Sequence, residues 1–168
     1  MSVSVHRGAL LHFLRDPGDG SDASAYEYFA DGLLVIASGR VVACGPATAL
    51  LATLPSTVPV TEHGNGLLVP GFIDSHMHYP QTDVIGSNGR QLLDWLNDYV
   101  FPTEARFADP GHAAVTANVC LDEMLRNGTT TALVFGTVHR QSVDAFFEAA
   151  EQRRMRMICG KVLPDPHS

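Results

Sequence analysis

Hydrophobic and polar positions follow two different patterns along the chain, and the pattern changes near residue 70. Before that point, short apolar and β-branched runs alternate with turns, over residues 5–14, 26–29, 32–37 and 40–44. Ser38-Gly39 separates the last two runs, and the glycine supplies the positive φ that a tight hairpin needs. The first pattern therefore predicts a small antiparallel sheet.

Beyond residue 70 the segments lengthen and alternate between strand and helix. Candidate strands cover residues 67–73, 129–135 and 155–163, and apolar residues at helical spacing cover 91–99, 113–125 and 141–153. The first of these strands is an uninterrupted apolar run, which predicts burial on both faces. Asp109-Pro110 is typical of a helix start, and Asn127-Gly128 is typical of a helix end. The alternation predicts a parallel sheet with crossover helices.

Composition favours a folded, acidic protein. Hydrophobic residues make up 45% of the 168 residues and charged residues 17%, against about 25% charged residues in an average soluble protein. The net charge of −7 and the lack of a basic cluster disfavour nucleic acid as a partner. No apolar run approaches the roughly 18 residues of a membrane span. Three widely spaced cysteines predict neither a disulfide framework nor a zinc ribbon, and we expect a cytoplasmic protein.

Two histidines carry the most informative chemistry in the chain. His76 and His78 stand two residues apart after an apolar run, so an extended strand would direct both imidazoles to one face. Neutral imidazole nitrogen is a good zinc ligand. In (β/α) barrels, the active site lies at the carboxyl ends of the parallel strands. Two ligands are fewer than a catalytic zinc usually has. The alternative is that both are ordinary polar residues at a strand end.

The segment around this pair resembles a known family. Residues 69–78 read VPGFIDSHMH, which is similar to the PGFIDxHxH pattern at the end of the first barrel strand in the amidohydrolase superfamily. Residues 31–46 look like the small β-domain that precedes this barrel. The resemblance implies an α/β fold: a (β/α)8 TIM-like barrel, of which only about the first three units are present, preceded by part of a small β-sandwich domain. We expect residues 1–68 to belong to the β-domain and residues 69–168 to the barrel.

Further blocks resemble the branch of this superfamily that deaminates guanine. They read HYPQ at 78–81, QLLDWL at 91–96, FPTEARF at 101–107, NGTTTA at 127–132 and GKV at 160–162. The resemblance implies a zinc-dependent enzyme, a homodimer, that hydrolyses guanine to xanthine and ammonia. Its small-molecule partners would be guanine and water, with one zinc ion in each subunit.

The same resemblance implies roles for individual residues. His76 and His78 match the first two metal ligands, and Gln81, with His78, matches the residues that contact the purine. A side-chain amide suits that task because it offers both a donor and an acceptor to the edge of a lactam ring. The alternative for Gln81 is a solvated loop residue.

Other residues near this segment keep two interpretations each. Asp74 either orients a histidine or caps a turn. Trp95 either forms a wall of the substrate pocket or packs in the core, and His139 either reaches the pocket or caps the next helix. Glu104 and Arg106 are close enough in sequence to form an ion pair.

The length of the chain limits the function expected of it. A complete (β/α) barrel takes about 250 residues, so we expect the remaining metal ligands and the acid/base carboxylate beyond Ser168. No catalytic residue is assigned within the chain, and the 168-residue chain alone is expected to be inactive. Two alternatives remain: another amidohydrolase acting on a different heterocyclic amine or amide, and a non-catalytic binding or assembly module. The exposed strand edges of such a remnant favour truncation over a free-standing module.

Overall fold

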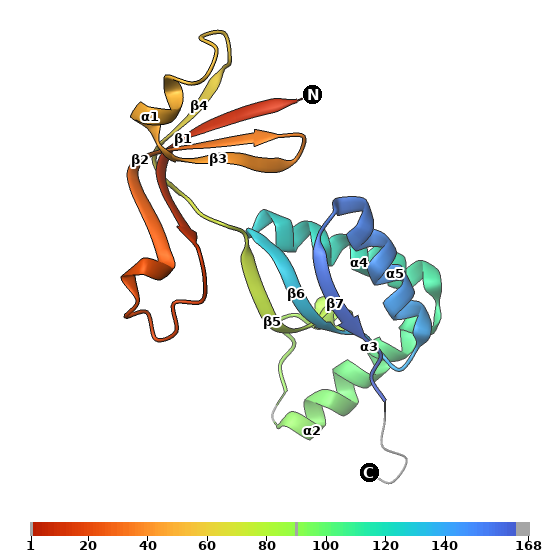
Figure 1. Ribbon diagram of the computed structural model, residues 1–168. Coiled ribbons are helices and arrows are strands. Elements are labelled where there is room, and N and C mark those ends of the chain that lie inside the picture. The colour runs from red at the N-terminus through yellow and green to blue at the C-terminus, as the bar shows by residue number, and fades with distance from the viewer. Residues whose placement is uncertain (1, 90, 164–168) are drawn as a thin grey trace. The chain divides into compact units, whose positions relative to one another are not determined.

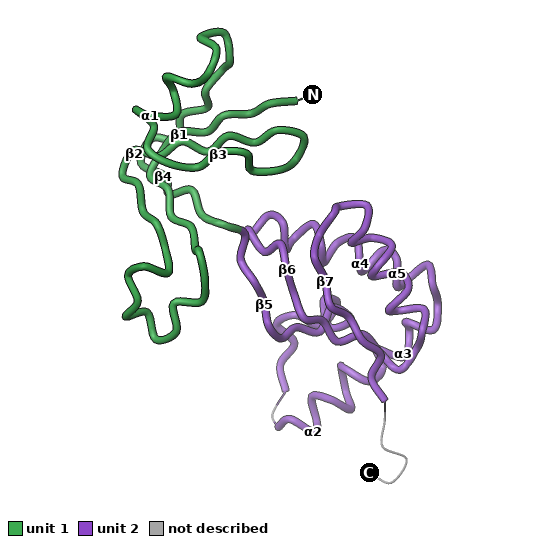
Figure 2. Tube along the Cα trace, in the orientation of Figure 1, with its two compact units in different colours: residues 1–70 green, residues 71–168 purple. Residues whose placement is uncertain are grey.

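The computed structural model describes residues 2–89 and 91–163. They form two compact units, residues 1–70 and residues 71–168 (Figure 2). No helix within these described residues combines the length and the apolar character that a membrane crossing requires.

The first unit is a four-stranded sheet with two short helical segments. Its strands are β1 (Val3–Phe13), β2 (Tyr26–Ala37), β3 (Arg40–Pro46) and β4 (Val60–Leu68), and its helical segments are η1 (Ala23–Ala25) and α1 (Ala47–Leu51). The strand order is β3-β2-β1-β4. β1 and β2 pair antiparallel, as do β2 and β3, whereas β4 runs parallel to β1. The expectation of an antiparallel sheet is therefore wrong at one edge, because the connection through α1 carries the chain across the sheet before β4 begins.

The predicted hairpin lies between β2 and β3, and Ser38 and Gly39 both have positive φ there, 52° and 76°. The two runs predicted over residues 26–29 and 32–37 form one continuous strand. The register shifts between Gly8 and Leu10 of β1, so β2 has one more residue than β1 between Phe29 and Gly32. The residues between the two predicted runs therefore lie in a β-bulge. Asp31 stands in this bulge and receives a two-pronged hydrogen bond from Arg7, at 2.7 and 2.8 Å.

The second unit is a parallel sheet with helices between its strands (Figure 1). Its strands are β5 (Phe72–His78), β6 (Thr129–Phe135) and β7 (Arg156–Gly160), in the order β5-β6-β7. Between β5 and β6 lie η2 (Tyr79–Val84), α2 (Leu92–Trp95), the π-helical turn η3 (Leu96–Val100), α3 (Phe101–Ala105), η4 (Arg106–Ala108) and α4 (Pro110–Arg126). α5 (Arg140–Arg153) joins β6 to β7. The predicted alternation of strand and helix is confirmed.

Helices α4 and α5 cover one face of this sheet and form the core with it. Leu121 and Phe146 are fully buried there, together with Ala132 and Val134 of β6. The opposite face of the sheet is open among the described residues: Leu133 is 39% exposed and Ile158 61%.

The first strand of this sheet begins later than its apolar pattern predicts. β4 ends at Leu68 and β5 begins at Phe72, so the apolar run over residues 67–73 spans a connection rather than one strand. Its expected burial on both faces is also wrong, since Phe72 is 59% exposed and Ile73 74%. β5 lies at the edge of the sheet, and the described helices cover only one face. An apolar run indicates a tendency to be buried but not what covers it.

Helix boundaries follow the local signals at some ends and not at others. The helix predicted over residues 91–99 continues as helical structure to Ala108, with the π-helical turn η3 directly before Pro102 in the first turn of α3. Asp109 caps α4 as expected, and its carboxylate accepts from the Gly111 amide at 2.9 Å. Gly128 follows the end of that helix with φ 81°.

Replacement of Gly71 by alanine should destabilise the second unit. A methyl group at this position would overlap the Thr130 side chain of β6, so we expect a loss of about 1–3 kcal/mol, typical of overpacking. Chemical denaturation measures the difference. Gly160→Ala is the matched control, because a Cβ there meets nothing within 4 Å. Equal stability of the two variants would contradict the close approach.

Candidate metal and substrate site

The two histidines of the motif lie next to each other at the carboxyl end of β5. The ring centroids of His76 and His78 are 5.2 Å apart, and the rings are inclined at 58°. Phe135 of the neighbouring strand contacts both rings: its centroid is 5.0 Å from that of His76 and 4.7 Å from that of His78, with which it stacks. The structure thus brings two imidazoles together on the open face of the sheet.

A bulge in β5 accounts for this orientation. The register between β5 and β6 passes from Asp74 opposite Ala132 to Met77 opposite Val134, so β5 has one more residue than its partner there. The Asp74 carboxylate accepts from the His76 backbone N–H at 3.0 Å. Of the two interpretations left open for Asp74, the structure corresponds to the turn-capping one: its carboxylate supports the backbone rather than an imidazole.

The electrostatics of His78 favour a neutral ring. Burial lowers the pKa of His78, and the neighbouring His76 lowers it further. Its Nδ1 atom is buried and has no hydrogen-bond partner within the described part of the chain. A neutral imidazole with a free ring nitrogen is the form that binds a metal ion. Over the same residues, no group of three or more metal-binding side chains is found, so the pair stands as two donors.

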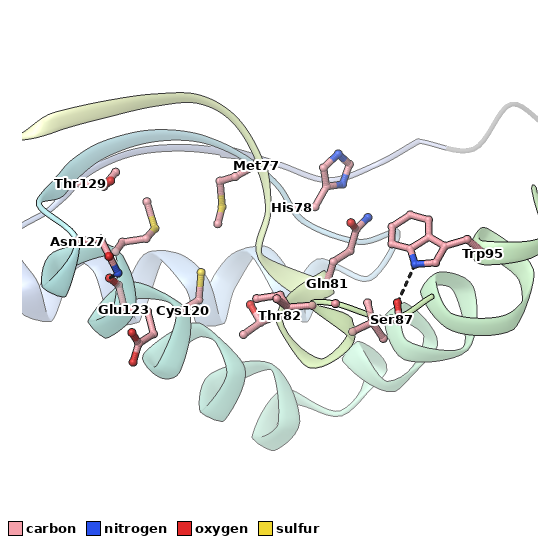
Figure 3. Close-up of a pocket in the computed structure, with 14 residues that line it drawn as sticks. Met77, His78, Gln81, Thr82, Ser87, Trp95, Cys120, Glu123, Asn127 and Thr129 are labelled. Atoms are coloured by element: carbon pink, nitrogen blue, oxygen red, sulfur yellow. Dashed lines mark hydrogen bonds between the residues drawn. The ribbon is translucent and has the colours of Figure 1, made fainter. Parts of the chain in front are cut away.

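A cavity of about 550 Å³ opens beside this strand end (Figure 3). Three residues singled out from the sequence line it: His78, Gln81 and Trp95. The Trp95 indole is held in place because its Nε1–H donates to Ser87 Oγ at 2.7 Å. Asp74, His76 and His139 are not among its lining residues.

The far end of the cavity is formed by residues to which the sequence analysis assigned no role in a site. Cys120, Glu123 and Asn127 belong to α4 or its end, and in Figure 3 Glu123, Asn127 and Thr129 lie opposite the His78 end. Helical spacing along α4 identifies which residues share a face, but nothing in the local sequence indicates that this face borders a cavity.

The carboxyl group of Glu104 lies near Gln81. Burial raises the pKa of the Glu104 carboxyl, and a side-chain hydrogen bond with Gln81 opposes that rise. The ion pair expected between Glu104 and Arg106 is not the pairing that the structure adopts. Arg106 instead binds Asp83 of η2 at 3.3 Å, and residues two apart on a helix do not face each other.

The segment that follows the histidines is anchored in the core by Tyr79, which sequence reasoning missed. Its side chain is fully buried, and its hydroxyl donates to the backbone carbonyl of Ser142 in α5. Burial raises the pKa of Tyr79 far above its usual value, so the hydroxyl remains protonated and can donate. The ring packs edge-on against Phe107, with centroids 5.4 Å apart. A tyrosine directly after the two histidines was the available signal.

His139 takes part in this anchor through its backbone. It is the N-cap residue of α5, its N–H donates to Thr137 Oγ1 at 3.1 Å, and its carbonyl accepts from Ser142 Oγ at 2.8 Å. Its side chain makes no capping hydrogen bond to α5, and the residue does not line the cavity.

Comparison with known proteins identifies the family. A model described as the amidohydrolase family matches residues 67–167. Guanine deaminase of Escherichia coli (strain K12) is 50% identical over 165 residues, which are 98% of this chain and 38% of that protein. The chain therefore spans about 38% of the length of this curated relative.

Solved structures agree with the fold expected from the sequence. The E. coli guanine deaminase structure matches with a TM-score of 0.85 and 43% identity, over 98% of this chain and 37% of that one. A guanine deaminase from C. acetobutylicum with bound guanine in its active site matches with a TM-score of 0.74 and 25% identity, over 98% and 38%. An atrazine chlorohydrolase from Arthrobacter aurescens TC1 complexed with zinc, 21% identical over 94% and 35% with a TM-score of 0.65, shares the fold. The α/β fold class, with part of a barrel after a small β-domain, is confirmed.

Removal of the Tyr79 hydroxyl should weaken the second unit. Tyr79→Phe removes the hydrogen bond to the buried Ser142 carbonyl, so we expect a loss of about 0.5–1.5 kcal/mol in the free energy of unfolding. Urea denaturation provides the measurement. Tyr99→Phe serves as the control, since Tyr99 is 39% exposed. A Tyr79→Phe variant as stable as the control would show that the hydroxyl anchors nothing.

Proposed function

The chain belongs to the amidohydrolase family, and we propose that it forms part of a zinc-dependent enzyme that hydrolyses guanine to xanthine and ammonia. One observation carries the proposal: the 50% identity to E. coli guanine deaminase extends over 98% of this chain. The presence of His78 and Gln81 in one cavity supports it.

We propose that His76 and His78 hold the zinc ion. Their chemistry fits, because both are imidazoles on one face and His78 has a buried ring nitrogen without a partner among the described residues. A bound zinc ion supplies Lewis-acid activation of water at neutral pH. The ligands that complete its coordination are not assigned to this chain.

Gln81 and Trp95 are assigned to the purine. The Gln81 amide offers one donor and one acceptor group to the ring edge, and both residues line the cavity with His78. The Trp95 indole, fixed by its bond to Ser87, provides a flat apolar surface of the kind that planar rings pack against. No contact with the purine is assigned to Asp74, whose carboxylate accepts from the His76 N–H, or to His139, and the acid/base role is assigned to no residue of this chain.

The setting of the enzyme is proposed on weaker grounds. We propose a cytoplasmic homodimer, with guanine and water as its small-molecule partners. The three cysteines are free thiols in the structure, which is consistent with a reducing compartment. Gel filtration of the purified protein tests the dimer.

The protein produced from the whole reading frame should convert guanine to xanthine. Gln81→Ala should raise the KM for guanine about tenfold, the effect of losing one or two hydrogen bonds, while the zinc content stays unchanged. Steady-state ultraviolet assays and metal analysis measure both. Turnover of a different heterocyclic amine, with none of guanine, would favour the alternative of another amidohydrolase.

Loss of the two motif histidines should abolish zinc binding. The double variant His76→Ala/His78→Ala should fall from about one zinc ion per subunit to almost none, as measured by metal analysis after dialysis. The matched control is His6→Ala/His63→Ala, which removes another adjacent pair of histidines, with a ring centroid separation of 5.3 Å. Unchanged zinc in the first variant would refute the assignment.

A further inference from the structure

We propose that Ser87 and Gly89 are positioning residues that hold the Trp95 indole in one orientation beside the bound purine. This inference rests on the proposed function, because the indole needs a fixed orientation only if the cavity binds a planar ring. It assigns a determinant of substrate affinity to the connection between η2 and α2. Neither residue is assigned a contact with the metal ion.

A hydrogen bond fixes the polar edge of the indole. Trp95 has one polar side-chain atom, Nε1, and that atom can only donate. Its N–H donates to Ser87 Oγ at 2.7 Å, which is the dashed line in Figure 3. Trp95 and Ser87 are both half-buried, and both line the cavity with Gln81. With its only donor engaged, the indole presents carbon atoms alone to a ligand.

A close approach of the backbone confines the base of the same side chain. A Cβ at Gly89 would lie 2.4 Å from Trp95 Cβ and 3.0 Å from Trp95 Cγ, well inside the roughly 3.5–4.0 Å of ordinary contact between carbon atoms. Gly89 does not have a positive φ, so its backbone conformation is open to other residues. The glycine therefore makes room for Trp95, and any side chain here would displace the indole.

The two contacts act on one side chain at two points, Nε1 and Cβ. An aromatic ring that is already immobilised loses no rotamer freedom when a ligand packs against it, and this raises the affinity. An apolar ring face favours any planar ring of suitable size, whereas an amide such as that of Gln81 distinguishes donors from acceptors at the ring edge. Purine recognition is then divided between a fixed apolar surface, Trp95, and a polar group, Gln81.

A double-mutant cycle in the protein from the whole reading frame tests the inference. The variants are Ser87→Ala, Trp95→Phe and the two combined, with the KM and kcat for guanine, the zinc content and Tm measured for each. We expect Ser87→Ala to raise KM about three- to tenfold, the effect of losing one hydrogen bond. The combined variant should be no worse than Trp95→Phe, because Ser87 acts only through an N–H that phenylalanine lacks. The kcat and the zinc content should stay unchanged.

Inhibition by hypoxanthine, a purine without the amino group of guanine, gives a second measurement. Because the fixed indole contacts a ligand through carbon atoms alone, Ser87→Ala should raise the inhibition constant of hypoxanthine by the same factor as the KM for guanine. A rise confined to guanine would overturn the inference, since it would mean that the Ser87–Trp95 pair reads the amino group.

Gly89→Ala tests the second contact, and Asn88→Ala is its matched control. Asn88 is exposed and stands between the two positioning residues in the same connection. Gly89→Ala should raise KM at least as much as Ser87→Ala does, whereas Asn88→Ala should leave KM unchanged. Equal rises in the Gly89 and Asn88 variants would overturn the inference, because they would reflect the connection as a whole rather than its contacts with Trp95.

A conservative variant separates positioning from general stabilisation. Ser87→Thr keeps the hydroxyl group, so it should recover most of the affinity that Ser87→Ala loses. A wild-type protein that converts guanine, together with a fall in Tm but no rise in KM in Ser87→Ala, overturns the positioning role alone. A wild-type protein that converts no guanine overturns the proposed function and this inference with it.

Discussion

The parallel pairing of β5 with β6 determines which side of the sheet the two imidazoles face. Met77 stands opposite Val134, whose side chain is buried in the core beneath α4 and α5, and Met77 packs against the same core. Its neighbours on the strand, His76 and His78, must then face the opposite side. A slip of one residue would turn both imidazoles into an apolar core, where unpaired polar groups are costly. Burial of a methionine thus holds the histidines in place.

The segment after the strand depends on the same core. Tyr79 follows His78 directly, and its ring lies against Phe107 and Phe146, with centroids 5.4 and 4.8 Å away. Because η2 begins at this buried residue, Gln81 extends from a turn whose first residue cannot move freely. Side chains positioned by such anchored segments keep their geometry better than those on free loops.

Local signals predicted the parts of the structure that local geometry controls. The spacing of His76 and His78, the cap at Asp109 and the helix end at Gly128 involve residues a few positions apart, and the structure has all three features. Contacts between distant segments were not predictable in this way. Tyr79 binds Ser142, 63 residues away, and Arg106 binds Asp83, 23 residues away. These pairs join η2 to α5 and to η4, and no spacing rule within one element describes such contacts.

Polarity along the open face of the sheet changes from one end of the strands to the other. Ile73 lies near the amino end of β5, whereas His76 and His78 lie at its carboxyl end. The interior of a (β/α) barrel has the same arrangement: apolar side chains fill it in layers, and the chemically active groups lie at the carboxyl ends of the strands. Ile73 and Ile158, which are 74% and 61% exposed, correspond to the apolar side chains that fill such an interior. Ile73, the last residue of the apolar run that predicted burial on both faces, therefore has the character of a barrel interior, although nothing among the described residues covers it.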